Sequence, residues 1–414
     1  MPETILFVNR FGWPDESATA RMLRGVSDGL ADEGFRVAVL CSGATYAGEM
    51  YSVANELREP PCSGVRYIRV PTTHFGRASL SGRVMDYLSF YVSAGWWLSN
   101  NMSQLRVLVV KTDPPLLGIW LQAIAGRHGT PVLHWTQDIF PEIASVRMGK
   151  GMVSKMLRAL KPIRNRTWMH SAGVVVVGED MRRYVCKQEV PEQKVACIEN
   201  AACASEISPV EPNTNALKKY WGLQEGFVLA YSGNLGRTHD TSVFLKAAEQ
   251  LARDDSTIFF LFIGGGYGYE QLHRRASYTL RQNMLFKPYQ PVEKLSESLG
   301  TGDLHWVSLA RNYQGLVVPS KIYSIMAAGR PQLFVGDPSS DIARMIEDNR
   351  IGRVAASAES FVEHVRHYME NPARLKDDSQ RARSHFLHYH ELAYRTTKWK
   401  KILANPATDA DGGI

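Results

Sequence analysis

The first half of the chain alternates short apolar runs with amphipathic stretches, and this alternation predicts a repeating strand–helix order. An amphipathic helix is expected at residues 17–33, between the first two strands. The predicted strands share continuous apolar side chains and lie at residues 5–8, 37–40, 66–70, 107–110, 132–135, 174–177 and 195–198. Because apolar strands separated by helices are typical of a mostly parallel sheet covered on both faces, we expect a Rossmann-like domain at residues 1–203.

The pattern lapses at residues 204–215, where Ser, Pro, Asn and Glu dominate, and we place the domain linker there. A second alternation predicts another doubly wound domain at residues 216–385, with strands at 227–231, 258–263, 284–286, 304–309 and 332–335. We expect a helix at 386–405 to pack back on the first domain and the polar tail at 406–414 to be disordered. The predicted fold class is therefore α/β, with two Rossmann-like domains facing across a cleft that binds ligands.

Composition narrows the class of protein further. With 414 residues, 44% hydrophobic and 21% charged, the chain has enough apolar side chains for two packed cores. Its five cysteines form no C-x-x-C pair and no zinc-like cluster, so we expect reduced thiols. The first residues lack a signal-peptide pattern, which makes the cytoplasm the expected compartment. No D-x-D motif follows a predicted strand, and no metal or other cofactor is expected.

The chain carries a net charge of +7, which suits anionic partners such as nucleotide phosphates, phospholipid headgroups or nucleic acid. Nine Lys and Arg residues fall within residues 150–187, where only Glu179 and Asp180 are acidic. This segment predicts a basic surface, although it contains no recognised nucleic-acid-binding module.

Two segments are candidates for contact with a membrane. Residues 84–98 contain Trp96 and Trp97 with a single charged residue, but they fall short of the ~20 residues needed to span a bilayer. They form either a buried core helix or an interfacial helix. Residues 152–161 predict an amphipathic basic helix that Pro162 ends or kinks, with Lys155, Arg158 and Lys161 on its polar faces. Both segments fall in the first domain.

The candidate chemistry of the second domain begins at its first predicted strand-to-helix turn. Gly233 and Gly236 allow close approach of an anion to the backbone, and Arg237 offers charge-assisted donors to phosphate oxygens. A second glycine-rich turn at 264–266 follows the next strand. Each turn alone could be a tight connection that needs glycine, but two after successive strands favour a phosphate-binding crevice.

A third motif starts a predicted helix at Pro319 and Ser320. It places Lys321 in the first helical turn, where a cation is unfavourable against the helix dipole unless an anion binds there. The alternative is a solvated lysine. Gly329 and Pro331 are expected to end this helix.

The order of these motifs resembles the retaining glycosyltransferases of family 4, which have the GT-B fold. The resemblance rests on residues 232–236, on 263–266, on the loop 286–289 and on 319–331, and it covers nearly the whole chain. It is strongest to the branch that builds bacterial surface polysaccharides, such as colanic acid and O-antigen.

Carried over by position, the resemblance implies that Arg237 and Lys321 neutralise the diphosphate of a nucleotide-sugar, with His239 as the alternative to Arg237. It also implies that Asp138, which follows a predicted strand, stands where many relatives place a histidine that contacts the transferred sugar; Glu142 is a second candidate, and Asp138 could instead cap the next helix. The implied donor-binding residues are Gly12, Gly233, Asn234, Gly236, His239, Gly265, Gly266, Lys287, Pro288, Tyr289, Ser320, Tyr323 and Ser324.

One departure from the family affects the sugar and ribose contacts. The two glutamates of the family's E-x7-E pattern fall near Leu316 and at Ser324, and neither is glutamate here. Gln314 and Tyr323 are stand-in candidates.

The resemblance implies metal-independent transfer of a sugar, with UDP favoured over GDP, to a glycan or polyprenyl-diphosphate-linked acceptor. The acceptor and the basic surface favour peripheral contact with the anionic inner leaflet of the membrane, and no nucleic-acid partner is expected. Two rival readings remain open: a hydrolysing nucleotide-sugar epimerase of the same two-domain layout, and a non-enzymatic nucleotide-binding protein.

Overall fold

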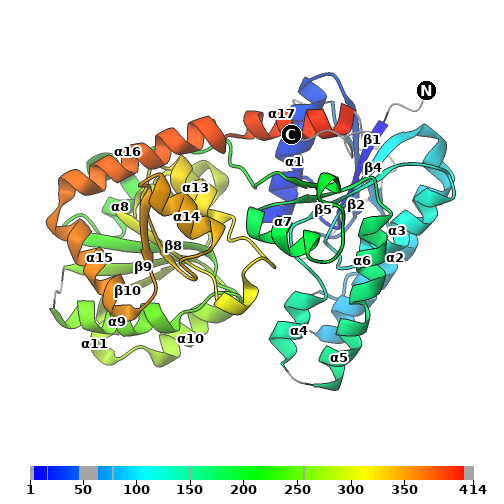
Figure 1. Ribbon diagram of the computed structural model, residues 1–414. Coiled ribbons are helices and arrows are strands. Elements are labelled where there is room, and N and C mark those ends of the chain that lie inside the picture. Colours follow the sequence, from blue (N-terminus) through cyan, green and yellow to red (C-terminus); the bar gives the residue numbers. More distant parts are fainter. Residues whose placement is uncertain are drawn as a thin grey trace. The chain divides into compact units, whose positions relative to one another are not determined.

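The structure is a computed structural model that describes residues 4–15, 17–45, 64–76, 79–149, 151–254 and 257–404 (Figure 1). The tail predicted at 406–414 lies outside these ranges. The chain divides into two compact units. The first unit consists of Met1–Glu199, Gly315–Val317 and Leu392–Ile414, and the second of Asn200–Gln314 and Val318–Glu391.

The first unit contains a seven-stranded parallel sheet in the order β3-β2-β1-β4-β5-β6-β7. Its side chains are almost all buried, as expected for strands covered by helices on both faces. Because β1 pairs with both β2 and β4, the strand order reverses at β1. The strands are β1 (Thr4–Val8), β2 (Arg36–Ser42), β3 (Arg66–Val70), β4 (Leu105–Lys111), β5 (Val132–Thr136), β6 (Gly173–Val176) and β7 (Val195–Cys197).

Alternate residues of β1 face different helices. Leu6 and Val8 belong to a core that α2 and α3 cover, whereas Phe7 contacts Trp135 and Trp399 at ring-centroid distances of 6.1 and 5.9 Å. Trp399 lies on α17, which packs beside α1 (Figure 1). The helices of this unit are α1 (Ala18–Asp32), α2 (Leu80–Asn101), α3 (Leu117–Gly126), α4 (Glu142–Met148), α5 (Met152–Ala159), α6 (Lys161–Met169), α7 (Glu179–Cys186) and α17 (Leu392–Ala404).

The second unit contains a six-stranded parallel sheet in the order β10-β9-β8-β11-β12-β13, so its order reverses at β8. Aromatic rings fill its core, where Phe244 stacks on Trp306 with centroids 4.4 Å apart. The strands are β8 (Phe227–Asn234), β9 (Ile258–Gly265), β10 (Met284–Lys287), β11 (Leu304–Ser308), β12 (Gln332–Val335) and β13 (Gly352–Ala355). The helices are α8 (Ala216–Tyr220), α9 (Ser242–Asp254), α10 (Tyr267–Arg275), α11 (Tyr278–Gln282), α12 (Leu295–Gly300), α13 (Lys321–Ala327), α14 (Asp341–Asp348), α15 (Ala358–Glu370) and α16 (Pro372–Tyr389).

The segments between the units differ in detail from the predicted boundaries. Residues 204–215, predicted as the linker, belong to the second unit, where Arg330 donates to the carbonyl oxygens of Val210 and Gly300 at 2.8 Å each. The helix expected at 386–405 is two helices, because α16 ends at Tyr389 and α17 begins at Leu392.

The two segments considered for membrane contact are helical. α2 is longer than the predicted 84–98, and α5 ends at Ala159 just before Pro162, which lies in the first turn of α6. Among the residues that the structure describes, none of the helices combines the length and apolar character needed to cross a membrane.

Candidate functional site

Two glycine turns interlock at the carboxyl edge of the second unit's sheet, beside β8 where the strand order reverses. A Cβ added to Gly264 would lie 2.6 Å from the carbonyl oxygen of Gly233, and one added to Gly266 would lie 2.2 Å from Oδ1 of Asn234. Both residues also have positive φ angles, of 129° and 116°, that disfavour other side chains. Only glycines therefore let the turns after β8 and β9 pack this closely.

Lys321 reaches this pair of turns from the start of α13. Its Nζ donates to the carbonyl oxygen of Asn234 at 3.3 Å and to the hydroxyl of Tyr231, and it lies 3.7 Å from the centroid of the Tyr231 ring. A Cβ added to Gly233 would lie 3.8 Å from Cε of Lys321. Burial lowers the pKa of the Lys321 ammonium well below its usual value. A bound anion would raise this pKa again, because its negative charge stabilises the protonated form.

The two basic side chains predicted after the first turn have different surroundings. Arg237 is exposed, and its guanidinium carbon lies 3.7 Å from the centroid of the Tyr267 ring. Nδ1 of His239 lies 2.5 Å from the carbonyl oxygen of Ser308, to which it donates. Burial, and then the Lys321 ammonium, lower the pKa of His239 to about 3. His239 is therefore uncharged near neutral pH.

Side chains at the end of β10 and in the loop after it point in two directions, one toward the glycine turns and the other toward Trp221. Tyr289, 60% exposed, has a ring carbon 3.8 Å from where a Cβ of Gly265 would lie. Nζ of Lys287 instead lies 5.5 Å from the Trp221 ring centroid, and Lys287 and Pro288 line a cavity of about 430 Å³ with residues of α8 and α12. The structure thus places Tyr289, rather than Lys287, beside the glycine turns.

The remaining predicted donor contacts of α13 differ in accessibility. Ser320 is the N-cap residue and Ser324 is half-buried. Tyr323 is 3% exposed, and its ring centroid lies 5.0 Å from that of His390. Tyr323 therefore packs into the second unit and away from solvent. Gly236 is open, with only Nδ2 of Asn234 within 4 Å of an added Cβ.

The carboxyl edge of the first unit's sheet carries its own charged residues. Gly12, predicted to face the donor, lies against β2, since a Cβ there would be 2.9 Å from Sγ of Cys41. Asp138 follows β5, and an isolated β-bridge joins it to Val317 of the same unit. Its side chain keeps solvent contact, but desolvation and then the like charge of Asp113 raise the pKa of its carboxyl to about 6, while Lys111 opposes them.

Sequence reasoning missed Lys111, the last residue of β4. Its side chain is 1% exposed, Nζ donates to the carbonyl oxygen of Thr19 at 3.0 Å and lies 4.1 Å from the Trp135 ring centroid. Burial lowers the pKa of Lys111 to about 7. The available signal was a lysine directly after the apolar run at residues 107–110.

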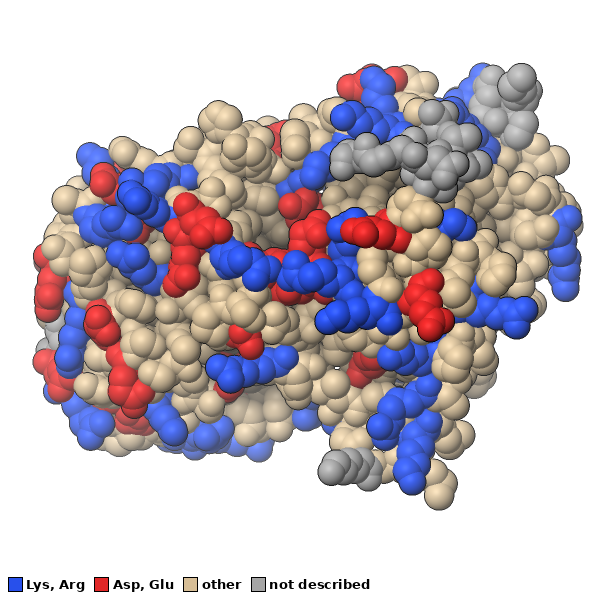
Figure 2. Space-filling view, viewed as in Figure 1, with Lys and Arg blue, Asp and Glu red and all other residues tan. Residues whose placement is uncertain are grey.

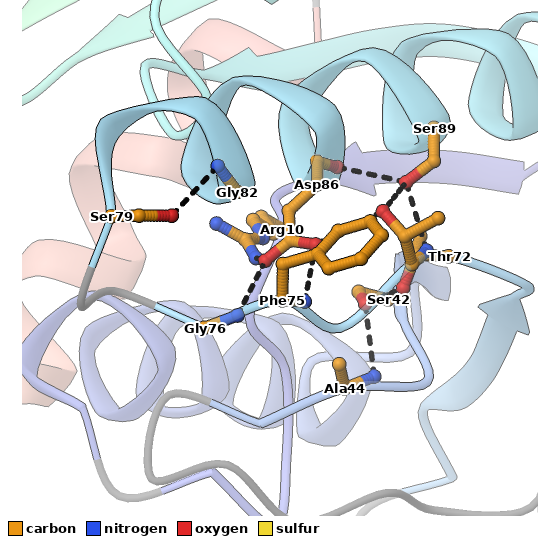
Figure 3. Close-up of polar contacts among 11 residues, drawn as sticks. Arg10, Ser42, Ala44, Thr72, Phe75, Gly76, Ser79, Gly82, Asp86 and Ser89 are labelled. Atoms are coloured by element: carbon orange, nitrogen blue, oxygen red, sulfur yellow. Dashed lines mark hydrogen bonds and ion pairs between the residues drawn. The ribbon is translucent and has the colours of Figure 1, made fainter.

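Sequence reasoning also missed a buried ion pair at this edge (Figure 3). Arg10 follows β1, and its Nη2 lies 3.1 Å from Oδ2 of Asp86 on α2, with exposed side-chain fractions of 7% and 1%. The neighbouring network includes a bond of 2.6 Å between the hydroxyls of Ser42 and Thr72. These contacts tie the chain after β1, β2 and β3 to α2.

The residues predicted for acceptor or membrane contact include both exposed and engaged side chains. Trp96 is 71% exposed, whereas Trp97 packs partly buried against the core beneath α2. Lys155 and Arg158 are exposed on α5, and basic side chains gather over α5 and α6 in Figure 2. Lys161 is instead held 3.7 Å from Glu142.

Glu142, the second candidate for a sugar contact, is engaged in structural contacts. Its carboxylate also accepts from Nη2 of Arg164 and from the hydroxyl of Tyr184, at 2.7 Å each. It therefore joins α4 to α6 and α7. Asp138 remains the more accessible carboxylate of the two.

Comparison with known proteins gives two family matches that together span most of the chain. Residues 17–201 match the family described as glycosyl transferase 4-like domain, and residues 214–385 match glycosyl transferases group 1. The chain is similar to the probable glycosyltransferase WbjE of Pseudomonas aeruginosa, with 25% identity over 315 residues, or 74% of each chain. It is also similar to the putative colanic acid biosynthesis glycosyl transferase WcaI of Escherichia coli K12, with 24% identity over 328 residues, 77% of this chain and 79% of WcaI.

Solved structures share the fold at low sequence identity. The Anabaena protein Alr3699/HepE in complex with UDP and glucose superposes with a TM-score of 0.71, covering 97% of this chain and 100% of that one, at 12% identity. At this identity the likeness concerns the arrangement of helices and strands, and it agrees with the two parallel sheets described above.

Proposed function

We propose, since this chain belongs to the GT-B glycosyltransferases of family 4, that it transfers a sugar from a nucleotide-diphosphate sugar with retention of anomeric configuration. The chain is a glycosyltransferase of polysaccharide biosynthesis. The proposal adds UDP as the preferred nucleotide and a glycan or polyprenyl-diphosphate-linked acceptor of bacterial surface polysaccharide synthesis.

The observation that carries the proposal is the group formed by Lys321 and the two glycine turns. A retaining transfer needs the departing diphosphate to be stabilised while the acceptor hydroxyl attacks from the same face. The Lys321 ammonium, fixed by Asn234 and Tyr231, offers a preorganised positive charge there, and Arg237 can add a second one. At Gly236 an added Cβ would meet only Nδ2 of Asn234, so the backbone of this turn is open to phosphate oxygens. These groups can stabilise the leaving group without a metal ion.

Asp138 is the proposed contact to the transferred sugar. Its carboxylate follows β5 at the edge where open α/β sheets bind ligands, and it can accept hydrogen bonds from sugar hydroxyls. In this proposal Asp138 stands where many relatives place a histidine, which would change the charge offered to the sugar.

A nucleotide-binding experiment tests the donor site. We expect UDP to raise the melting temperature of the purified protein more than GDP does, because a ligand that binds only the folded state stabilises it. The HepE complexes with UDP and with UDP-glucose support the choice of UDP. A selective response to GDP would overturn the nucleotide preference, and no response to either nucleotide would contradict the donor site itself.

A product assay separates transfer from the epimerase alternative. With a UDP-sugar and no acceptor, a transferase should release UDP slowly, and it should release it faster once an acceptor glycan is added. Rapid acceptor-independent release of UDP with an epimerised free sugar would identify a hydrolysing epimerase.

Peripheral membrane contact is proposed from the outer face of the first unit. α2 exposes a row of large apolar side chains, each between 45% and 71% exposed: Leu80, Val84, Met85, Leu88, Val92 and Trp96. Apolar groups gathered in this way on a soluble surface are typical of interaction sites. α5 exposes Met152 and Met156, at 80% and 66%, beside Lys155 and Arg158. Apolar and basic side chains together fit an anionic bilayer surface.

Flotation with vesicles tests this contact. We expect the protein to float with phosphatidylglycerol vesicles and less with phosphatidylcholine vesicles, because Lys155 and Arg158 contribute electrostatic attraction. Trp96→Ser and Met156→Ser should each weaken flotation. Tyr220→Ser is the matched control, since Tyr220 is 84% exposed but lies on the second unit. Equal flotation of all three variants would contradict the assignment of this face.

A further inference from the structure

The ion pair between Arg10 and Asp86 divides its hydrogen bonds unequally. Oδ1 of Asp86 accepts from the Thr73 hydroxyl and from the Phe75 amide, at 2.9 Å each. Oδ2 accepts from Nη2 of Arg10 at 3.1 Å and from the Gly76 amide at 3.2 Å. Figure 3 shows the carboxylate held between Arg10 and the backbone at Phe75 and Gly76. The carboxylate therefore shares its charge with three donors besides Arg10.

The guanidinium of Arg10, by contrast, has N–H groups that the ion pair with Asp86 does not use. Its guanidinium meets Asp86 through Nη2 alone, and its buried Nε has no hydrogen-bond partner among the described residues. The whole residue is 5% exposed. An unpaired N–H of a buried cation is costly, because the group has lost water without gaining an acceptor. Nε of Arg10 therefore lacks an acceptor among the described residues, and an anion would supply one.

Arg10 also lies where ligands bind in open α/β sheets. Its amide donates to the carbonyl oxygen of Asp113 after β4 at 2.8 Å, and its carbonyl oxygen accepts from the Ser42 amide of β2 at 2.9 Å. This places it at the reversal of strand order around β1. The rings of Phe11 and Tyr87, with centroids 5.0 and 5.1 Å from the guanidinium carbon, limit its orientation.

Other buried polar atoms at the carboxyl edge of the first unit's sheet also lack hydrogen-bond partners among the described residues. Oδ1 of Asn9, Oγ of Ser17 and Nε2 of Gln137 are buried and lack partners within the described part of the chain. They lie after β1, before α1 and after β5. Polar atoms without partners are uncommon in folded proteins, and several along one ligand-binding edge indicate a polar ligand.

We propose that Arg10, oriented by Asp86, binds the diphosphate of a phosphorylated acceptor. The inference rests on the proposed function, in which the donor's diphosphate occupies the site of Lys321 in the second unit. The same chemistry could come from that donor, but the position of Asp86 favours the acceptor. Asp86 lies on α2, the helix whose outer face exposes apolar side chains, so a diphosphate at Arg10 would lie at the helix proposed to touch the membrane. Asp86 is a positioning residue, and Arg10 is the binding residue.

Titration of the full chain with farnesyl diphosphate, a water-soluble prenyl diphosphate, tests the inference by calorimetry. It is performed with and without saturating UDP, so that the donor site is filled in one arm. We expect farnesyl diphosphate to bind in the presence of UDP, and R10Q to weaken this binding by about tenfold or more, since a charge-assisted bond is lost. UDP affinity should be unchanged in R10Q. Arg24→Gln is the matched control, because Arg24 forms a partly exposed pair with Asp28 in the same unit.

The outcomes separate this inference from the donor proposal. Failure of UDP to bind the native chain would contradict the proposed donor site. Equal affinity of R10Q and the native chain for farnesyl diphosphate would overturn only the role of Arg10. Competition between farnesyl diphosphate and UDP, with no binding once UDP is saturating, would also overturn it and assign the ligand to the donor site. If R10Q fails to fold, the arginine Nε–H resonance of the native chain, assigned with R10K, decides: it should shift on titration, and an unchanged resonance refutes the proposal.

Discussion

Replacement of Lys321 by Met should separate the function of this residue from its effect on stability. The side chain is held by Asn234 and Tyr231, and burial lowers its pKa. Met has a similar length and no charge, so it removes the ammonium from this site and leaves an apolar chain against the Tyr231 ring. Tyr231 keeps a partner, because its hydroxyl donates to the carbonyl oxygen of Asn234 at 3.2 Å.

The expected loss concerns the ligand. A lost charge-assisted hydrogen bond costs about 1.5–3 kcal/mol, which corresponds to a roughly 10- to 150-fold rise in the Kd for UDP. If Lys321 also stabilises the departing diphosphate, kcat should fall by a further factor of about 10²–10³. Calorimetry with UDP and steady-state turnover of a UDP-sugar measure the two effects.

Although Lys321→Met should lose UDP affinity, the thermal stability of the ligand-free protein should stay the same or rise. A desolvated ammonium is unfavourable in the absence of an anion, so Lys321→Met should unfold at the same temperature as the native chain or above it. Lys294→Met, an exposed lysine of the same unit, controls for the change of side chain. A Lys321→Met protein with lowered thermal stability and unchanged UDP affinity would refute this reasoning and make Lys321 a structural residue.

Four further predictions follow from individual contacts. Tyr231→Phe removes a partner of Lys321 and should weaken UDP binding by about 1 kcal/mol, measured by calorimetry. UDP affinity should fall as the pH rises through the lowered pKa of Lys321, because the complex holds the protonated lysine and binding takes up a proton; Lys321→Met should lack this dependence. If ionised Asp138 contacts the sugar, kcat should decline as the pH falls through about 6, and Asp138→Asn should abolish that limb of the profile. Trp399→Ala should lower the free energy of unfolding by about 3–5 kcal/mol in urea titrations, whereas Tyr394→Ala, at a partly exposed position of the same helix, should change it little.

The two sheets were predictable because their strands are continuous apolar runs with helices between them. The expected strand at 5–8 lies within β1, and 258–263 lies within β9. Register and strand order were not predictable, since apolar strands buried on both faces carry no alternation that would fix their neighbours. The break between α16 and α17 was also missed, because the helix predicted at 386–405 contains no proline or glycine to mark it.

The sequence predicted some features of the candidate site, and others required the structure. Residue type and position identified candidate phosphate-binding residues, among them Gly264, Gly266 and Lys321. How the glycine turns and Lys321 pack together could be seen only in the structure. Lys287 and Tyr323 carry the right residue types, but the strand and helix they occupy direct them toward Trp221 and His390. Direction follows from the tertiary neighbours of an element, and a sequence motif does not encode it.

Several charged side chains at the carboxyl edges of the two sheets are buried, which is unfavourable for stability. Burial lowers the pKa of Lys111 to about 7 and that of Lys321 well below its usual value, and Nε of Arg10 is buried without an acceptor among the described residues. A core selected for stability alone would place apolar residues at such positions, because burial of a charge without full pairing is unfavourable. Ligands of opposite charge would remove this deficit at Lys321 and Arg10. Apolar substitution of Lys321 should therefore preserve stability while binding is lost. Substitution of Arg10 would also leave the buried Asp86 carboxylate without its cation, and truncation of Trp399 in the core should lower stability.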